Sequence, residues 1–288
     1  MEHRSPDPRI AAAEIDRINT FFPLLPSLGL RWARTRPWEG LRIAVNAHLT
    51  TLTGALVREL TLGGGEWVLC ATNEATTDAD VVELLREQGV TVHTGRGKVA
   101  NRYRTTLDSQ PVLIADVGFE LLGELLDRSE DQAAMLRGCV EITRTGVNRW
   151  LERQAGRPST LPLRVVNLND TELKSHVENR HGVGSGLWGC VTQITGLHLS
   201  GRRVLVVGYG PVGQGIAAMA RSLGANVEVV DTDAMRRLVA SYDGFPTPSL
   251  HHGLERADIA VTATGRSGAI TVEHLADLKS GVVLVNAG

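Results

Sequence analysis

The stretch "RRVLVVGYGPVGQG", residues 202–215, is the most informative part of the sequence, because an apolar strand runs into a glycine-rich turn that opens a helix. In such a turn Gly208 permits the sharp bend, Gly210 lets the backbone approach a pyrophosphate, and Gly213 lets helix and strand pack closely. The helix start also presents unpaired N–H groups to phosphates. The stretch therefore predicts a dinucleotide site of the Rossmann type.

An acidic residue after the next strand indicates which dinucleotide binds. Asp231 closes "NVEVVD", residues 226–231, where a carboxylate can accept hydrogen bonds from a ribose diol. The same carboxylate would repel a 2′-phosphate, so the sequence favours NAD as the cofactor. Arg236 and Arg237 follow closely and leave NADP as the lesser alternative.

Short β-branched runs alternate with helical periods on both sides of this stretch. The strands expected before it are "LRIAVN" at 41–46, "EWVLCA" at 66–71, "PVLIAD" at 111–116, "CVEIT" at 139–143 and "LRVVNL" at 163–168. Those expected after it are "NVEVVD", "ADIAVTATG" at 257–265 and "GVVLVN" at 281–286, with helices near 211–223, 233–240 and 271–278. The first 38 residues read as one helix with an irregular lead-in.

This alternation is typical of parallel sheets with helices on both faces. We predict an α/β protein with two doubly wound parallel-sheet domains. Residues 1–180 would form a substrate-binding and catalytic α/β domain, and residues 181–288 a Rossmann NAD-binding domain. The glycine-rich segment around Trp188 predicts a joint that permits closure, with Trp188 either packed in a core or placed at the hinge.

The composition favours small-molecule chemistry. The chain is 42% apolar and 22% charged, with 30 basic and 32 acidic residues, so no charge excess points to nucleic acid or to a membrane surface. Its three cysteines are scattered, which argues against a disulfide scaffold and a zinc site, and we expect no metal. No signal peptide or long apolar run is visible, so we expect a cytoplasmic protein.

Polar residues close or follow the expected strands of the first domain, at the edge where ligands bind in open parallel sheets. They are His48, Asn73, Asp116, Glu141, Thr143 and Asn169. We expect them to converge, although His48 or Asp116 alone could equally be a cap or turn residue.

The stretch "NDTELKSHVENRHG", residues 169–182, places Lys174 and Glu178 one helical turn apart. On an open surface this spacing would be an ordinary ion pair. In a closed cleft, a lysine beside a carboxylate can be poised to take a proton from a hydroxyl while hydride leaves the same carbon.

Together these features resemble the S-adenosylhomocysteine hydrolase (adenosylhomocysteinase) family. The similar segments are "LRIAVNAHLT", "IADVG", "TGVNR", "NDTELKSHVEN", "LSGRRVLVVGYGPVGQG", "VVDTD" and "TATG". The resemblance implies tightly held NAD, transient oxidation of a nucleoside ribose 3′-hydroxyl, elimination of the 5′-thiolate, addition of water and reduction of the ketone. It also implies a homo-oligomer.

The resemblance assigns roles residue by residue. Lys174 and Glu178 would handle the 3′-hydroxyl proton, and Asn179 would sit by the nicotinamide. His48 and Asp116 would serve the C4′ proton and the 5′ leaving group or water. The implied substrate-binding residues are Thr50, Leu52, Asn73, Glu141 and Thr143. The implied cofactor-binding residues are Gly208, Gly210, Pro211, Val212, Gly213, Asp231, Thr145, Thr262, Thr264 and Asn286.

The sequence departs from the family at the substrate. Leu52 stands where the family reads the adenine edge with a carboxamide or carboxylate, and Ile142 where a ribose-binding glutamate is expected. The family's next histidine and long C-terminal segment would follow Gly288, so we expect either an incomplete chain or a site without that lid.

Three functions are therefore compared. The favoured one is an adenosylhomocysteinase-like enzyme acting on S-adenosylhomocysteine or a related nucleoside. The alternatives are a catalytically silent NAD-binding regulatory homologue and a diverged NAD-dependent nucleoside or sugar oxidoreductase. A 2-hydroxyacid dehydrogenase ranks last, because its Arg, Glu and His trio is not found at the expected places.

Overall fold

The computed structural model describes residues 4–95, 99–156 and 163–288, which divide into two compact units. Unit 1 is Met1–Leu168 and unit 2 is Asn169–Gly288. The division falls before the stretch that carries Lys174 rather than at residue 180, so the contacts of that stretch assign it to unit 2.

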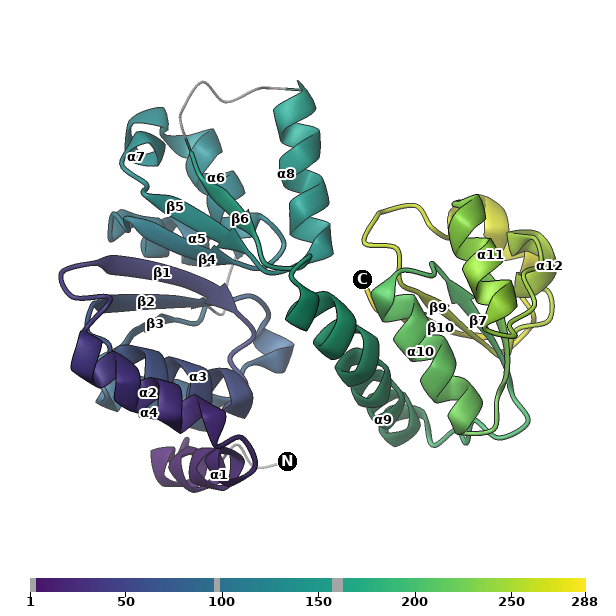
Figure 1. Cartoon of the computed structure of the whole chain (residues 1–288), viewed down its shortest axis with the longest axis horizontal. Helices are drawn as coiled ribbons and strands as arrows, with labels where there is room; N and C mark the ends of the chain where they lie inside the picture. The colour runs from purple at the N-terminus through teal and green to yellow at the C-terminus, as the bar shows by residue number, and fades with distance from the viewer. Residues whose placement is uncertain (1–3, 96–98, 157–162) are drawn as a thin grey trace. The chain divides into compact units, whose positions relative to one another are not determined.

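Unit 1 is built on a parallel sheet with the order β3-β2-β1-β4-β5-β6, labelled in Figure 1. The strands are β1 (Arg42–Ala47), β2 (Glu66–Ala71), β3 (Thr91–His93), β4 (Leu113–Asp116), β5 (Gly138–Glu141) and β6 (Val165–Asn167). The chain leaves β1 in one direction and returns on its other side at β4, which is the doubly wound arrangement and confirms the predicted fold class.

The helices of unit 1 are α1 (Pro8–Phe21), α2 (Leu24–Thr35), α3 (Thr51–Thr61), α4 (Ala79–Glu87), α5 (Val99–Asp108), α6 (Glu120–Arg128), α7 (Glu130–Ala134) and α8 (Arg144–Gly156). A short 3₁₀ turn, η1 (Glu74–Thr76), follows β2. Alternate strand residues pack on opposite faces: Val45 lies in a core with Ala55 and Val81, while Ala44 lies in another with Leu121.

Two parts of unit 1 differ from the sequence prediction. The N-terminal region forms two helices rather than one, because Phe22, which precedes Pro23, leaves helical geometry at φ −120° and ψ 64°. Pro8 and Pro26 both lie in first helical turns, where proline is tolerated. The pair β3 and α5 was not predicted, since a three-residue strand is too short to show alternation.

Unit 2 contains a parallel sheet with the order β10-β9-β7-β8. Its elements are η2 (Leu173–Gly182), α9 (Val183–Thr195), β7 (Arg203–Val207), α10 (Pro211–Ser222), β8 (Asn226–Val230), α11 (Ala234–Tyr242), α12 (Leu250–Leu254), β9 (Ile259–Thr262), η3 (Val272–Asp277) and β10 (Val283–Asn286). The element expected near 271–278 is a 3₁₀ helix, and α12 was not predicted. Because β7 lies between β8 and β9, successive strands are added first on one side of β7 and then on the other. The winding of the sheet therefore reverses beside the glycine-rich turn.

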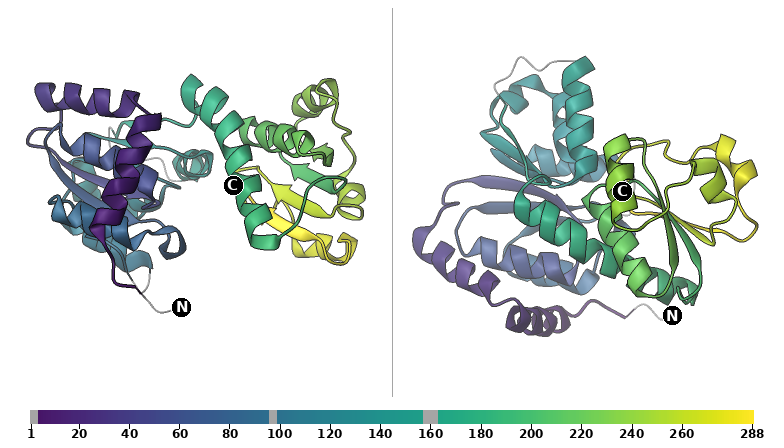
Figure 2. Two further views of the ribbon diagram at one scale, coloured as in Figure 1. Left: turned by 90° about the horizontal axis from the view of Figure 1, so that it is seen from below. Right: turned by 45° about the vertical axis from the view of Figure 1, so that its right-hand side comes forward.

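The helix pair η2 and α9 packs on α10 within unit 2, and Figure 2 shows α9 alongside α10. A Cβ on Gly215 would lie 2.0 Å from the Arg180 carbonyl oxygen, and one on Gly184 would lie 2.5 Å from the Gly215 carbonyl oxygen. Trp188 is buried in the same core and donates a hydrogen bond of 3.0 Å to the Ile216 carbonyl. Of the two predicted roles of Trp188, the structure therefore shows packing in a core.

Across the described ranges, no helix is both long and apolar enough to span a bilayer.

Candidate active site

The glycine-rich turn after β7 is held by close backbone contacts. Gly208 has φ 106°, and a Cβ there would lie 2.6 Å from the Ala263 carbonyl oxygen. A Cβ on Gly213 would lie 1.9 Å from the Gly208 carbonyl oxygen. Both positions therefore require glycine, which places the turn tightly between β7 and β9 at the carboxyl edge of the sheet.

The start of α10 fits the pyrophosphate of a dinucleotide. Gly210 is the N-cap residue, and within the described chain no side chain caps this helix. Pro211 occupies the first turn, where its missing N–H costs nothing, and Val212 follows it. The nearest atom to a Cβ on Gly210 would be Arg236 Nη1 at 3.8 Å, so the backbone face of the turn stays open to a phosphate.

Asp231 links the turn to the end of β8. Its carboxylate accepts hydrogen bonds from the Tyr209 N–H at 2.6 Å and the Asp233 N–H at 2.9 Å. Arg236 Nη1 lies 3.7 Å from it, whereas Arg237 donates to the Asp231 carbonyl at 2.8 Å. This anionic position beside the turn suits the ribose diol of NAD.

The ends of β9 and β10 lie beside the same turn. Thr262 Oγ1 donates a hydrogen bond of 2.9 Å to Asn286 Oδ1. Thr264 Oγ1 accepts from the Arg266 N–H at 3.2 Å, and its Cγ2 would lie 3.1 Å from a Cβ on Gly208. These predicted cofactor residues therefore gather at one edge of unit 2.

The helix η2 carries the predicted acid–base group. Its π-helical geometry is rare and is frequently found at functional sites. Lys174 Nζ donates to Glu178 Oε2, with the two side chains 23% and 50% exposed. Asn179 is buried and donates a hydrogen bond of 3.2 Å to Asn169 Oδ1. All of these residues lie in unit 2 with the glycine-rich turn.

In unit 1, Asp116 ends β4 at the point where the sheet winding reverses. It is fully buried and accepts hydrogen bonds of 2.9 Å from Asn46 Nδ2, from the Val117 N–H and from the Leu122 N–H. Burial raises the pKa of the Asp116 carboxyl to about 6, and the donors from Leu122 and Asn46 partly oppose that rise. Sequence reasoning missed Asn46, which lies inside β1, because the pattern of strand ends does not show which side chains bond across neighbouring strands.

Glu141, at the end of β5, organises the loop that follows Asp116. Its buried carboxylate accepts hydrogen bonds from the N–H groups of Gly118 at 3.1 Å and Phe119 at 2.9 Å. It also accepts from the Thr143 hydroxyl at 2.7 Å. Thr145, a predicted cofactor residue, lies in the first turn of α8 in this unit.

The remaining predicted residues of unit 1 have local partners. His48 Nδ1 lies 2.7 Å from Thr76 Oγ1. Thr50 caps α3, and Asn73 caps η1 by accepting the Ala75 N–H at 2.8 Å. Leu52, on α3, is 59% exposed and offers only an apolar surface.

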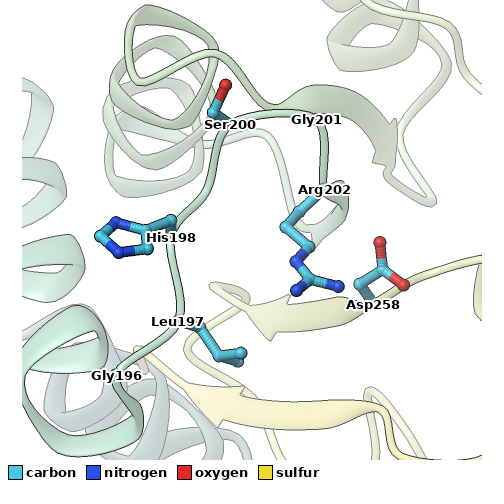
Figure 3. A pocket seen from close by; sticks show the side chains of 7 residues that line it. All are labelled: Gly196, Leu197, His198, Ser200, Gly201, Arg202 and Asp258. Carbon is cyan, nitrogen blue, oxygen red and sulfur yellow. The ribbon is translucent and has the colours of Figure 1, made fainter.

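A pocket at the other edge of the unit 2 sheet is separate from the glycine-rich turn. It is lined by Gly196, Leu197, His198, Ser200, Gly201, Arg202 and Asp258. Figure 3 shows the Arg202 guanidinium turned toward Asp258. Because Asp258 precedes β9 and Arg202 precedes β7, the pocket lies at the amino ends of the strands.

The described parts of the chain contain no group of three or more His, Cys, Asp or Glu side chains that could hold a metal ion.

Comparison with known proteins gives a family match within unit 2. A family model described as "S-adenosyl-L-homocysteine hydrolase, NAD binding domain" matches residues 179–288. The match and the fit of the glycine-rich turn assign NAD to unit 2 as its cofactor.

Relatives extend the similarity to the whole chain. S-inosyl-L-homocysteine hydrolase of Methanopyrus kandleri is 35% identical over 100% of this chain and 69% of its own length. Adenosylhomocysteinase of Pyrococcus abyssi is 35% identical over 96% of this chain and 66% of its own length. Adenosylhomocysteinase of Thermotoga maritima is 32% identical over 96% and 69%, respectively. The chain thus spans about two thirds of the length of these relatives.

A solved structure shares the fold. A phosphoglycerate oxidoreductase of Vibrio cholerae aligns over 85% of this chain and 75% of its own, with a TM-score of 0.50 and 15% identity.

Proposed function

The chain belongs to the S-adenosyl-L-homocysteine hydrolase family, and from this premise we propose that it is an NAD-dependent hydrolase of a nucleoside thioether. Bound NAD would supply reversible oxidation of the ribose 3′-hydroxyl. The substrate would be S-adenosylhomocysteine or a close analogue such as S-inosylhomocysteine. In this proposal unit 1 binds the nucleoside and unit 2 binds the cofactor.

One observation carries the proposal. The helix with Lys174, Glu178 and Asn179 packs on α10, the helix that the glycine-rich turn opens, with the Gly215 backbone against the Arg180 carbonyl. A base on η2 therefore keeps its place relative to the cofactor turn, because both belong to one compact unit.

Each side chain on η2 has a defined task in this proposal. Lys174 would accept the proton of the 3′-hydroxyl, and Glu178 would hold the Lys174 side chain in place. Asn179, fixed by Asn169, would orient the nicotinamide amide. Oxidation of the alcohol then makes the neighbouring C–H acidic enough for removal by a positioned base.

Unit 1 supplies that second step in the proposal. Asp116, with its raised pKa of about 6, can exchange a proton near neutral pH. His48 would serve the 5′ leaving group or water. Leu52 gives no hydrogen bond to the base, so we expect the enzyme to distinguish adenosine and inosine thioethers poorly.

The test begins with nucleotide released from purified protein, which we expect to be NAD. Absorbance of the reduced nicotinamide should then rise when adenosine, inosine or their homocysteine thioethers are added. Lys174→Ala should retain NAD but lose this response. Lys279→Ala is the matched control, because Lys279 also pairs with a carboxylate, Asp258, but at the amino edge of the sheet. Equal reduction in both variants would refute the role of Lys174.

The alternative functions are outcomes of the same test. Retained NAD with no response to the nucleoside panel would support a silent regulatory homologue. Reduction without thioether cleavage would support a nucleoside or sugar oxidoreductase. We further propose a cytoplasmic homo-oligomer that binds no nucleic acid. Light scattering would measure the oligomeric state. Purification with and without nuclease would show whether nucleic acid copurifies with the protein.

A further inference from the structure

Arg102, on α5, is a buried cation whose one ion pair among the described residues, with Glu74, is long. Its side chain is 5% exposed. Nη2 donates to the Thr72 carbonyl at 3.3 Å and Nη1 to the Gly95 carbonyl at 3.5 Å. The nearest carboxylate oxygen among its ion pairs, Glu74 Oε1, is 3.8 Å away, and among the described residues Nε has no partner.

This arrangement is energetically unusual for arginine. A guanidinium removed from water normally forms short, paired hydrogen bonds with a carboxylate. A buried donor without an acceptor costs about 1–3 kcal/mol. The long contacts of Arg102 and its unpaired Nε therefore point to an anion that completes the site.

The position of Arg102 relates it to the proposed active site. Thr72, which accepts from Arg102, donates through its hydroxyl at 2.9 Å to Asn46 Oδ1, and Asn46 in turn bonds Asp116. Glu74 lies in η1, the turn whose Thr76 lies beside His48 Nδ1. Arg102 thus lies at the carboxyl edge of the sheet, beside β2, next to the proposed proton-transfer groups.

We propose that Arg102 is the specificity-determining residue that recognises the carboxylate of the substrate's amino-acid portion. The inference rests on the proposed function, because a homocysteine thioether ends in an α-carboxylate. A bidentate contact would satisfy Nε and one Nη together. The half-exposed Glu74 competes for the same guanidinium and must swing away when the substrate carboxylate binds.

The experiment measures dissociation constants by calorimetry for two ligands, with the 288-residue protein carrying Lys174→Ala so that the thioether is not cleaved during the titration. One is S-adenosylhomocysteine, and the other is the same thioether lacking only the carboxylate. Arg102→Met should weaken the first at least about 10-fold and leave the second within about 2-fold. Glu74→Gln should strengthen the first several-fold and leave the second unchanged. Arg104→Met, on the same helix but exposed and paired with Glu124, should change neither.

Each outcome decides the proposal. Equal weakening of both ligands in Arg102→Met would show a merely structural role and overturn it. If Arg102→Met does not fold, Glu74→Gln decides, because no gain for the carboxylate ligand would also overturn the proposal. Failure of the wild-type protein to bind either ligand would contradict the proposed function as well, whereas binding of both without carboxylate dependence would contradict this inference alone.

Discussion

The side-chain amide of Asn46 donates a hydrogen bond of 2.9 Å to Asp116, joining two buried residues on adjacent strands at the point where the sheet reverses its winding. Asn46 Oδ1 accepts in turn from the Thr72 hydroxyl. Together with the N–H groups of Val117 and Leu122, this strand-to-strand bond fixes the position of the carboxylate, which suits a group that exchanges protons.

The first prediction concerns pH. The Asp116 carboxyl has a pKa of about 6 in the fold against 3.8 as its ordinary value, so the folded protein binds more protons than the unfolded chain between these values. The contribution of the Asp116 carboxyl to stability is fully present below its unfolded pKa of 3.8 and is lost as the pH rises through its folded pKa of about 6. Asn46→Ala removes a donor that favours the charged form, which should raise the pKa further.

Asn46→Ala should therefore lower the free energy of unfolding by about 1 kcal/mol more at about pH 7 than at about pH 4. Urea unfolding of variant and wild type at both pH values measures this difference. Other groups change stability with pH in the opposite sense, such as Asp258, whose pKa is lowered by Lys279. Because variant and wild type share these groups, their effects cancel in the difference between the two proteins. Asn226→Ala, on the surface, should show no such pH dependence, and a pH-independent loss in Asn46→Ala would contradict the prediction.

The second prediction concerns Glu141, whose carboxylate receives the N–H groups of Gly118 and Phe119. In Glu141→Gln an amide nitrogen replaces one acceptor and faces these donors. We expect a loss of about 2 kcal/mol in unfolding free energy and a lower rate of substrate turnover, because the loop after Asp116 loosens. Glu83→Gln, which breaks only an exposed pair with Arg86, should stay within about 0.5 kcal/mol. Equal stability of the two variants would argue against this role.

Particular residues show what the sequence could predict. The glycine-rich turn was predictable because Gly208 and Gly213 meet backbone atoms at distances that admit no side chain. The convergence at the sheet edges also followed from strand ends. In contrast, Asn46 and Arg102 could not be found, because one lies inside a strand and the other on a helix that follows a three-residue strand. Their roles depend on partners distant in sequence, which local patterns do not encode.

The attachment of Lys174 to unit 2 was likewise beyond the pattern. Its helix follows β6, the last strand of unit 1, in the sequence. The expectation that polar residues after a strand lie at the edge of that strand's sheet therefore places Lys174 in unit 1. The close contact of Gly215 with the Arg180 carbonyl joins the Lys174 helix to α10. A single glycine inside a helix does not indicate from the sequence which segment packs against it.

The third prediction concerns cofactor choice. Asp231→Asn keeps an acceptor for the Tyr209 N–H but removes the charge that opposes a 2′-phosphate, while Arg236 lies 3.7 Å away. We expect the NADP-to-NAD affinity ratio to rise about 10-fold or more, measured by titration of protein freed of nucleotide. Adding Arg236→Met should reverse most of that gain. An unchanged ratio in Asp231→Asn would mean that this carboxylate does not select the cofactor.

The fourth prediction compares two glycines that both lie in helices of unit 2. Gly213→Ala would place a Cβ 1.9 Å from the Gly208 carbonyl oxygen, and because this neighbour is backbone, the turn itself must move. Gly189, on α9, has no atom within 4 Å of its added Cβ, so alanine there should stabilise the helix by about 0.5–1 kcal/mol. We expect Gly213→Ala to lose bound NAD while Gly189→Ala retains it, measured by nucleotide released per chain. Because both changes add the same methyl group to a helix, retention of NAD by Gly213→Ala would show that the turn tolerates displacement and does not cradle the pyrophosphate.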